Sequence, residues 1–444
     1  MTEKMKPSGI GWIKDIPESW KTSKVKFLAT EPGTLFLDGD WIESDVIEES
    51  GIRYLTSGNV GAGFYKDQGS GHISEKTFNE LHCLKVFPGD LMISRLNEPI
   101  GRACIVPEGE PCYVVAVDNV ILRPNKEYDR KFIMYAMNTE GYAEHGNMIA
   151  RGATMSRVSR SQLGQFWLAF PGITEQSAIA DFLDAQCAKI DSVIADIEKQ
   201  IETLQKYKKS LITEAVTKGL DRSVPMRDSG IDWIGEIPDH WDTNRLRYVA
   251  SVKTGPFGTQ LSADEYVDEG VPIINVKNIG YGSILAEDLD FVPETVADRL
   301  SVHRLKINDI VFGRKGAVDK HAIITDKYAD WVQGSDCIRV RSNPEIDSEY
   351  LNYLFDSTYF GSYVMLYAVG ATMPSMSSDI LLNARILVPP VQEQKDIAAH
   401  LNNQCGKIND IIANKKEQLA AIRSHKKSMI YEYVTGKKRV TEVS

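Results

Sequence analysis

The sequence lacks the features that mark several large classes of protein. None of its six cysteines forms a Cys-x-x-Cys pair, so neither a zinc knuckle nor a disulfide framework is indicated; they are Cys83, Cys104, Cys112, Cys187, Cys337 and Cys405. No apolar run approaches the ~18 residues that a membrane-spanning helix needs, and the first residues carry no apolar leader. We therefore expect a cytoplasmic protein with reduced thiols and no membrane partner.

The motifs of common enzymes are absent as well. We find no G-x-x-x-x-G-K-[ST] phosphate loop, no Gly-rich cofactor loop and no G-x-S-x-G nucleophile elbow. The eight histidines show no metal-ligand spacing. The "EQK" at Glu393 resembles half of a metal-dependent nuclease motif, but both "EQK" and its counterpart "EQS" open a helix, where acidic residues are favoured. We expect this chain to catalyse no reaction and to hold no cofactor or metal.

The charge of the chain leaves its partners open. Hydrophobic residues make up 43% of the 444 residues, which suits well-packed globular domains, and the formal net charge is -10. This acidity argues weakly against a protein coated in nucleic acid, because phosphate contacts need lysine and arginine. It does not exclude a basic groove on an acidic body. It is also the best support for an alternative, a structural adaptor whose domains bind proteins.

What the sequence does contain is a repeat of itself. The stretch "GIGWIKDIPESW" from Gly9 returns as "GIDWIGEIPDHW" from Gly230. Further blocks recur in the same order: "GDLMISR" matches "NDIVFGR", "GATM" occurs twice, and "PGITEQSAIADFLDAQ" matches "PPVQEQKDIAAHLNNQ". Such self-similarity indicates two copies of one structural unit. The copies differ much more in sequence than in length, which suits two similar scaffolds with different surfaces.

Each copy predicts a compact domain followed by one long helix. Short β-branched runs between Gly, Pro and Asp indicate strands, and a helix of about three turns begins at Asp129 in one copy and at Asp347 in the other. We expect an α+β protein with a first domain at 1–170, a long helix at 171–220, a linker and second domain at 221–388, a second long helix at 389–436 and a tail at 437–444. The two ends of the chain resemble the linker cut open, so that joining them would close a ring.

Both long helices carry an apolar seam with alternating steps of four and three residues. This spacing is typical of coiled coils, and the most economical partner for each helix is the other, in an antiparallel pair with internal pseudo-two-fold symmetry. Lys208 and Lys426 lie at matching seam positions, where each could fix the register, contact a partner or extend into solvent. The expected pairing residues are Leu183, Ile190, Ile194, Ile197, Ile201, Leu204, Leu401, Ile408, Ile412, Leu419 and Ile422.

Two variable domains, each followed by a helix opening with "P-x-x-E-Q", resemble the specificity subunit of type I restriction-modification systems. The resemblance covers essentially the whole chain. It implies that each domain reads one half of a bipartite, non-palindromic site in double-stranded DNA, while the paired helices hold the domains apart. It also implies two methyltransferase subunits and restriction subunits as partners, with S-adenosylmethionine, ATP and Mg²⁺ bound by those partners. A specificity subunit that serves only a methyltransferase fits the sequence equally well.

Basic and hydroxyl side chains near the variable blocks are the candidates for contact with DNA. Arginine can chelate guanine edges and lysine can neutralise phosphate, although either residue is equally common as solvated surface. The first copy concentrates arginines after Gly141, whereas the second places its positive charge beside Arg314. The candidates are Arg95, Arg102, Arg151, Thr154, Arg157, Arg160, Lys277, Arg314, Lys315, Lys320, Thr372 and Ser375.

Overall fold

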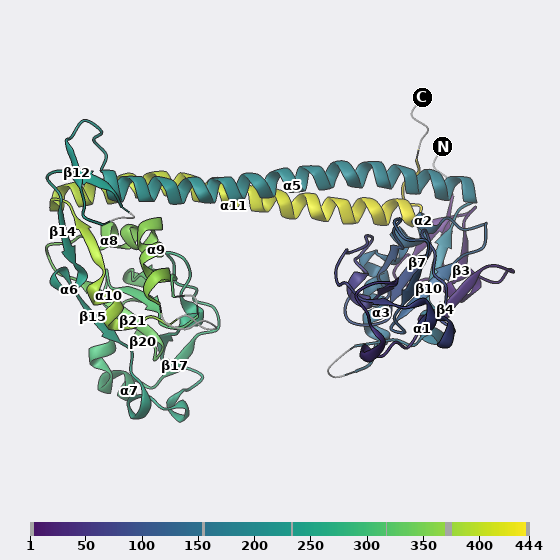
Figure 1. The fold of residues 1–444 in the computed structure, drawn as a ribbon, viewed down its shortest axis with the longest axis horizontal. Coiled ribbons are helices and arrows are strands. Elements are labelled where there is room, and N and C mark those ends of the chain that lie inside the picture. Colours follow the sequence, from purple (N-terminus) through teal and green to yellow (C-terminus); the bar gives the residue numbers. More distant parts are fainter. Residues whose placement is uncertain (1–3, 153–155, 232–233, 317, 369–374, 441–444) are drawn as a thin grey trace. The chain divides into compact units, whose positions relative to one another are not determined.

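The computed structural model of the chain describes residues 4–152, 156–231, 234–316, 318–368 and 375–440. It divides into two compact units, each holding one copy of the repeat (Figure 1). The first unit consists of Met1–Ile197 together with Glu417–Ser444, and the second of Glu198–Lys416.

The globular part of the first unit is built from short strands with helices between them. Its strands are β1 (Met5–Pro7), β2 (Asp15–Pro17), β3 (Lys21–Lys24), β4 (Leu35–Asp38), β5 (Ile52–Leu55), β6 (His72–Ile73), β7 (Leu91–Ser94), β8 (Ala103–Ile105), β9 (Tyr113–Val115), β10 (Asn119–Arg123) and β11 (Trp167–Phe170). Its helices are α1 (Glu75–Glu80), α2 (Arg130–Met137), α3 (Glu140–Ile149) and α4 (Arg160–Leu163).

The globular part of the second unit repeats this order. Its strands are β12 (Met226–Asp228), β13 (Glu236–Pro238), β14 (Asp242–Arg245), β15 (Ala250–Thr254), β16 (Val271–Ile274), β17 (Asp290–Val292), β18 (Ile310–Gly313), β19 (His321–Ile323), β20 (Val332–Gln333), β21 (Cys337–Ser342) and β22 (Arg385–Val388). Its helices are α6 (Leu246–Val249), α7 (Glu294–Arg299), α8 (Ser348–Asp356), α9 (Thr358–Tyr367) and α10 (Ser378–Asn383).

The same sheets form in both copies. A four-stranded antiparallel sheet has the order β4-β10-β7-β8 in the first copy and β15-β21-β18-β19 in the second. A three-stranded sheet contains one parallel pair, β5 with β9 in the first copy and β16 with β20 in the second. The expectation of a strand-rich, mixed α/β domain in each copy is therefore confirmed, and the repeat extends to strand order.

The helix after the main sheet begins where the sequence predicts it in both copies. The Asp129 side chain accepts a hydrogen bond from the backbone N–H of Phe132, and Asp347 accepts one from Tyr350. Such N-caps satisfy backbone donors that have no partner within the helix. Helices α2 and α8 bury most of their residues and thereby close one side of each core.

A glutamine at the start of each long helix ties that helix to the globular domain. The Gln176 amide nitrogen donates to the carbonyls of Pro171 and Glu127, at 2.9 and 3.0 Å, and its carbonyl accepts from the N–H of Asp129 at 2.9 Å. Gln394 makes the matching three contacts, at 2.7, 3.1 and 2.7 Å. Both side chains are buried. The glutamine of the "P-x-x-E-Q" motif thus satisfies three backbone groups at once, through one buried hydrogen bond and two partly buried ones.

Replacing Gln394 by alanine is expected to lower the free energy of unfolding by about 2–4 kcal/mol, because one buried and two partly buried backbone groups lose their partner. The matched control is Gln392→Ala, since Gln392 lies two residues earlier on the same helix with an exposed side chain. Urea denaturation followed by circular dichroism measures both. A loss of similar size in both variants would contradict the role given to Gln394.

Two long helices complete the units. Helix α5 runs over Ile173–Lys218 and helix α11 over Val391–Val434. Both lie inside the ranges expected from the seams, 171–220 and 389–436. The first part of α5 belongs to the first unit and the rest to the second, while α11 is shared in the opposite order. The helices therefore belong to the cores of the units, and the division into separate domains and helices stays a prediction.

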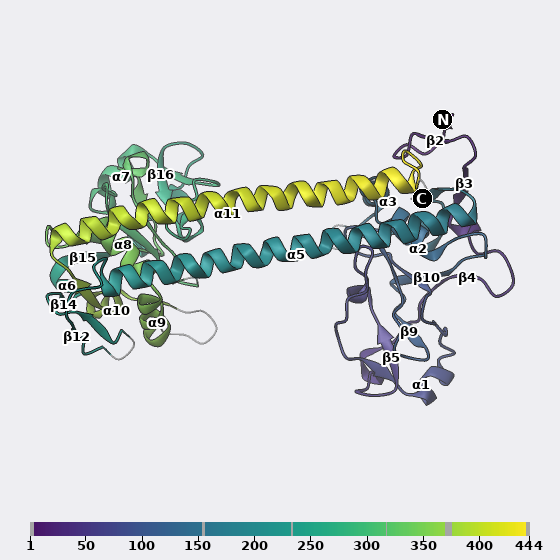
Figure 2. The same cartoon turned by 90° about the horizontal axis from the view of Figure 1, so that it is seen from above.

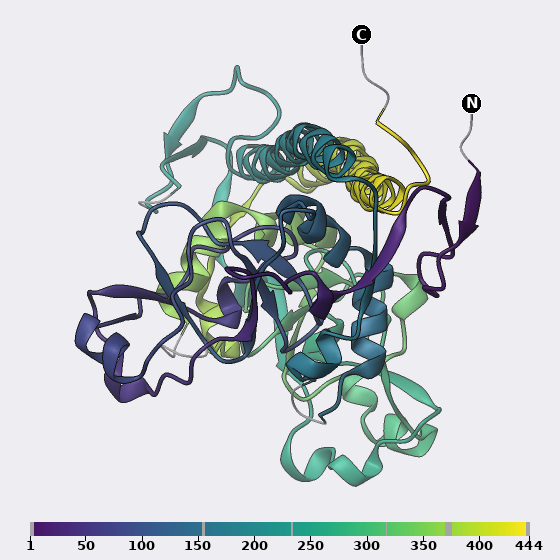
Figure 3. The ribbon, with the colours of Figure 1, turned by 90° about the vertical axis from the view of Figure 1, so that its right-hand side faces the viewer.

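Within each unit the two helix segments lie side by side and run antiparallel (Figure 2). In the first unit Lys426 pairs with Asp191 at 2.6 Å and the rings of Phe182 and Tyr433 lie 4.6 Å apart. Figure 3, in which the first unit faces the viewer, shows the two helix segments lying over the strands. In the second unit the Lys208 amine donates to Asn409 at 3.0 Å. Both seam lysines thus contact the neighbouring helix.

Burial along the seam depends on position. Leu183 and Leu401, near the starts of the helices, are fully buried because they also belong to the cores of the domains. The other expected seam residues fall into two groups: Ile197, Ile408, Ile412 and Leu419 are buried, whereas Ile190, Ile194, Ile201, Leu204 and Ile422 are partly exposed.

Each long helix ends against a buried tryptophan. Gly219 follows α5 with φ +72°, and a Cβ there would lie 3.2 Å from the ring of Trp241. Gly436 follows α11 with φ +71°, and a Cβ would lie 3.2 Å from the ring of Trp20. The left-handed backbone favours glycine at both helix ends. The chain that follows α11 therefore packs against Trp20 of the first copy. The linker that follows α5 packs in the same way against Trp241 of the second copy.

Candidate nucleic-acid interface

The candidate residues of the first unit gather at the end of strand β7. Arg95 follows this strand, and its guanidinium donates to the carbonyls of Val117 and Val158. Asp38, at the end of β4, lies 3.3 Å from Arg95 and 3.5 Å from Arg160. The two arginines are thus held on either side of one carboxylate.

The chain returns to this place as a short hairpin. Val158 donates to the Arg95 carbonyl at 3.1 Å, and Arg151 and Arg157 exchange two backbone hydrogen bonds, both at 3.1 Å. The side chains of Arg151 and Arg157 are exposed. Thr154, which we also expected at this site, lies outside the described residues. The two exposed arginines at the base of the hairpin provide the most accessible positive charge of this site.

A polar cavity of about 530 Å³ lies beside the arginines. It is lined by Arg95, Arg160, Lys26 and Asp38, together with hydroxyl and amide groups of Ser159, Ser161 and Gln165. Three cations against one carboxylate leave the cavity with a net positive charge. Such a lining suits a phosphate group, which arginine binds in a bidentate manner.

The second unit builds the same backbone frame with different side chains. Arg314 donates its N–H to the Asp336 carbonyl at 2.8 Å, as Arg95 does to Asp118 at 3.0 Å. Met376 donates to the Arg314 carbonyl at 2.9 Å, as Val158 does to that of Arg95. The frame is therefore shared by the two copies down to single hydrogen bonds.

On this shared frame the charges differ. Lys315 and Ser375 form the isolated bridge that Leu96 and Arg157 form in the first copy. The Lys315 amine lies 3.3 Å from Asp336, so its charge is partly neutralised. Thr372 lies outside the described residues. The second copy thus presents a less positive and chemically different surface at the same place.

Arg102 has a structural position that the sequence did not predict. Its guanidinium donates to the carbonyls of five residues at 2.8–3.3 Å, namely Ser57, Val60, Leu96, Asn97 and Pro99. Burial lowers the pKa of this side chain. Because all its nitrogens already donate within the domain, Arg102 holds two loops together. Its contact with DNA stays a prediction.

The Lys320 carbonyl accepts a hydrogen bond from Gly313, next to Arg314, whereas the Lys277 side chain is held by two carboxylates. Lys277 sits between Asp288 and Asp290, 3.2 Å from each, so two carboxylates surround one amine. These carboxylates raise the pKa of Lys277. The Lys320 amine lies 5.7 Å from the ring centre of Tyr281, within the range of a cation–π contact. Of the expected second-copy set, Lys277 is thus the residue whose charge is enclosed by carboxylates.

Sequence reasoning missed an exposed aromatic residue that recurs in both copies. Trp41 is 73% exposed and Phe257 is 60% exposed. Each lies two residues after a glycine, Gly39 or Gly255, where any side chain would overlap with a neighbouring backbone carbonyl. The signal was available as a Gly-x-aromatic pattern at the end of the first strand of each main sheet. A flat apolar side chain in this place suits stacking on a base.

In the described part of the chain, no helix combines the length and the apolar character that crossing a membrane requires. Among the same residues, no cluster of three or more His, Cys, Asp or Glu side chains is placed to hold a metal ion.

Known proteins resemble this chain in sequence. Residues 238–421 match the family model described as type I restriction modification DNA specificity domain. Among curated proteins, the type I restriction enzyme MjaVIII specificity subunit of Methanocaldococcus jannaschii is 27% identical over 334 residues, covering 72% of this chain and 73% of that protein. The putative MjaX specificity subunit of the same organism is 26% identical over 382 residues, covering 83% of each chain.

A solved structure shares the fold. It comes from a study of complex assembly and conformational transition of the type I restriction-modification system, and it aligns with a TM-score of 0.70 at 13% identity. The alignment covers 95% of this chain and 99% of that one. At this identity the likeness concerns the fold alone, a mixed α/β protein with long helices.

Proposed function

We propose that this chain is a specificity subunit of a type I restriction-modification system and that it reads a bipartite, non-palindromic DNA site with one half-site in each domain. DNA recognition is the function that the family model and the relatives support. The finer proposal rests on one observation, the shared backbone frame around Arg95 and Arg314 that carries different side chains in the two copies. Equal frames with unequal surfaces suit two unlike half-sites.

In the first domain we assign direct contact with DNA to the exposed pair Arg151 and Arg157. Arg95 and Arg160, held by Asp38, line the cavity that would bind a phosphate of the DNA backbone. In the second domain Lys315 and Ser375 occupy the matching place. Trp41 and Phe257 are candidates for stacking on bases or sugars at the edge of each half-site.

We further propose that the chain recruits two methyltransferase subunits and restriction subunits rather than performing chemistry itself. The support is the family of its relatives, which are specificity subunits of restriction enzymes. In that arrangement S-adenosylmethionine, ATP and Mg²⁺ are bound by the partner subunits. This chain recognises the DNA sequence and provides the surface on which the partner subunits assemble.

Selection from random DNA duplexes tests the proposal. The chain is mixed with its cognate methyltransferase subunit, and the duplexes retained at moderate salt are sequenced. Two unlike half-sites separated by a fixed number of free bases are expected. An intact complex that enriches no motif would overturn the proposal and favour the structural adaptor. Phosphate contacts require an affinity for DNA that falls steeply as the salt concentration rises. A structural adaptor is expected to show no such affinity.

A complex that methylates without cutting is the second form of the same function. The net charge and the site are compatible with both forms, since neither cutting nor methylation is performed by this chain. Adding the restriction subunit and ATP to the assembled complex distinguishes them, because only the restriction form then cleaves unmethylated target DNA.

We also propose that α5 and α11 form one continuous antiparallel coiled coil that sets the distance between the half-sites. Deleting residues 202–208 and 408–414, one heptad from each helix, removes about 10 Å of helix, which corresponds to about three base pairs. The preferred number of free bases is expected to change in the duplex selection. An unchanged preference in a folded variant counts against the helices as a ruler.

A further inference from the structure

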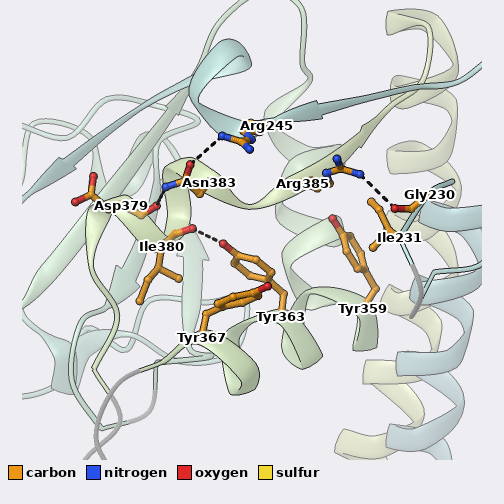
Figure 4. Close-up of a pocket in the computed structure, with 10 residues that line it drawn as sticks. All are labelled: Gly230, Ile231, Arg245, Tyr359, Tyr363, Tyr367, Asp379, Ile380, Asn383 and Arg385. Atoms are coloured by element: carbon orange, nitrogen blue, oxygen red, sulfur yellow. Dashed lines mark hydrogen bonds between the residues drawn. The ribbon is translucent and has the colours of Figure 1, made fainter.

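A pocket of about 610 Å³ lies in the second unit, apart from the residues assigned to DNA contact. Three tyrosines on successive turns of α9 form one wall, as Figure 4 shows: Tyr359, Tyr363 and Tyr367. Arg245 and Arg385, from the paired strands β14 and β22, lie across from them. Asp379, Ile380 and Asn383 of α10 close one end, and Gly230 and Ile231 the other.

The residues that precede and begin the last strand differ between the copies. In the first copy Phe166 precedes strand β11 and is buried against Tyr142 and His145, with ring centres 5.5 and 4.9 Å apart. The residue that precedes the matching strand β22 is Ala384, which is buried as well. The next residue changes from Trp167 to Arg385. The second copy thus has a cation lining the pocket at the position where the first copy has a tryptophan.

The tyrosine wall carries one hydroxyl group without a partner. Tyr359 is only 4% exposed, and its oxygen makes no hydrogen bond to the described residues. The neighbouring Tyr363 hydroxyl, by contrast, donates to the Ile380 carbonyl at 2.7 Å. Burial raises the pKa of Tyr359, so its hydroxyl keeps the proton and is available as a donor. A buried polar group usually has a partner, and a ligand acceptor in the pocket would supply one.

The two arginines make the pocket receptive to an anion. The Arg385 guanidinium donates to the Gly230 carbonyl at 3.3 Å, and Arg245 donates to Asn383 at 3.4 Å. Neither forms an ion pair with a carboxylate among the residues that the structure describes. Asp379, at the opposite end in Figure 4, offers an acceptor for an amino or hydroxyl group. The pocket therefore combines an anion site, an aromatic wall and a single acceptor.

We propose that this pocket binds a nucleotide unit, with the base against the tyrosine wall and the phosphate at Arg245, Arg385 and the Tyr359 hydroxyl. A cavity of this volume is of the usual size for a small-molecule site. Aromatic side chains stack on bases of any sequence, and arginine binds phosphate through two parallel hydrogen bonds. The nucleotide comes either free from solution or as part of a single strand. None of the residues proposed for half-site reading is used, so the two proposals stand or fall separately.

The test measures binding of dAMP to the full chain by isothermal titration calorimetry in the absence of duplex DNA. Saturable binding at one site per chain is expected, with deoxyadenosine and inorganic phosphate each bound at least tenfold more weakly. Tyr359→Phe removes only the hydroxyl and is expected to weaken dAMP binding roughly tenfold, and Arg385→Gln by more, since hydrogen bonds to charged groups are the stronger ones.

Two control variants separate the pocket from general damage to the fold. Tyr142→Phe removes a hydroxyl in the first copy that is also buried without a partner, and Arg299→Gln removes a half-exposed arginine elsewhere in the second unit. Both are expected to bind dAMP as the unchanged chain does. A short single-stranded oligonucleotide that competes with dAMP identifies a strand as the source, while failure to compete identifies the free nucleotide.

No saturable binding of dAMP up to millimolar concentration overturns the proposal. Equal binding of phosphate and dAMP also overturns it, because the tyrosine wall would then contribute nothing. Unchanged binding in both Tyr359→Phe and Arg385→Gln would place the nucleotide elsewhere. In all three cases half-site selection on duplex DNA is unaffected, so the proposed function is judged independently.

Discussion

Replacing Arg151, Arg157 and Arg160 together by alanine is expected to weaken recognition of one half-site by about 100-fold or more and to leave the other unchanged. Each arginine that contacts a base edge contributes about 1–3 kcal/mol, and each phosphate contact adds about one to the salt slope. Arg151 and Arg157 are exposed at the base of the hairpin, whereas Arg160 is held beside Asp38. We therefore expect the exposed pair to account for most of the loss.

The measurement is the affinity of the complex with its methyltransferase subunit for duplexes in which one half-site at a time is scrambled. The matched control replaces Lys395, Lys407 and Lys416 by alanine. These three lysines are exposed on α11, so their substitution removes the same amount of positive charge at positions far from the hairpin in sequence. Equal loss at both half-sites, or equal loss in the control, would show that only net charge matters.

Asp90→Ala is expected to lower the free energy of unfolding by about 3–5 kcal/mol. The carboxylate is 1% exposed and receives two hydrogen bonds from Arg123, at 2.9 and 2.6 Å. Removing the buried carboxylate leaves the charge of the partly exposed Arg123 without compensation and the N–H of Phe87 without its acceptor. The second copy repeats the pair as Asp309 with Arg341, with both bonds at 2.6 Å. Asp309→Ala should therefore destabilise the second unit by a similar amount.

Thermal and urea unfolding measure these effects, and a second substitution tests their cause. In the double variant Asp90→Ala with Arg123→Met, the uncompensated charge is removed, so part of the lost stability should return. Glu80→Ala breaks an exposed pair with Lys76 and is expected to cost less than about 1 kcal/mol. If the double variant is no more stable than Asp90→Ala, cavity formation rather than charge explains the loss.

The repeat and both long helices could be predicted from the sequence because their signals are local and periodic. The four-three spacing from Leu183 and from Leu401 places the helices inside the expected ranges. The N-caps at Asp129 and Asp347 are equally local, since one side chain and the N–H three residues later decide them. Features that depend only on spacing along the chain are therefore the ones that the sequence predicts well.

The roles of single side chains were less predictable because their partners are distant in sequence. Arg102 carries the same charge as Arg157, yet it is enclosed by carbonyls of loops beginning at Ser57 and Leu96. The nucleotide pocket depends on a strand, a helix and the opening motif of the second copy meeting in space. No periodicity in the sequence predicts such a meeting. The Gly-x-aromatic pattern before Trp41 and Phe257 was visible in the sequence, but only the exposure of the two rings indicates a role for it.

The sharing of the long helices also affects the order in which the protein can fold on the ribosome. The second unit is one continuous stretch, whereas the first requires residues from 417 onward, including Met429 and Val434 in the core around Trp20. About 220 further residues must be made before these arrive, which takes roughly 10–45 s at typical rates of synthesis. During that time the apolar face of α5 near Leu183 lacks its cover. The domain whose synthesis begins first is thus the last to be completed, and it is the one most exposed to chaperones and to misassembly.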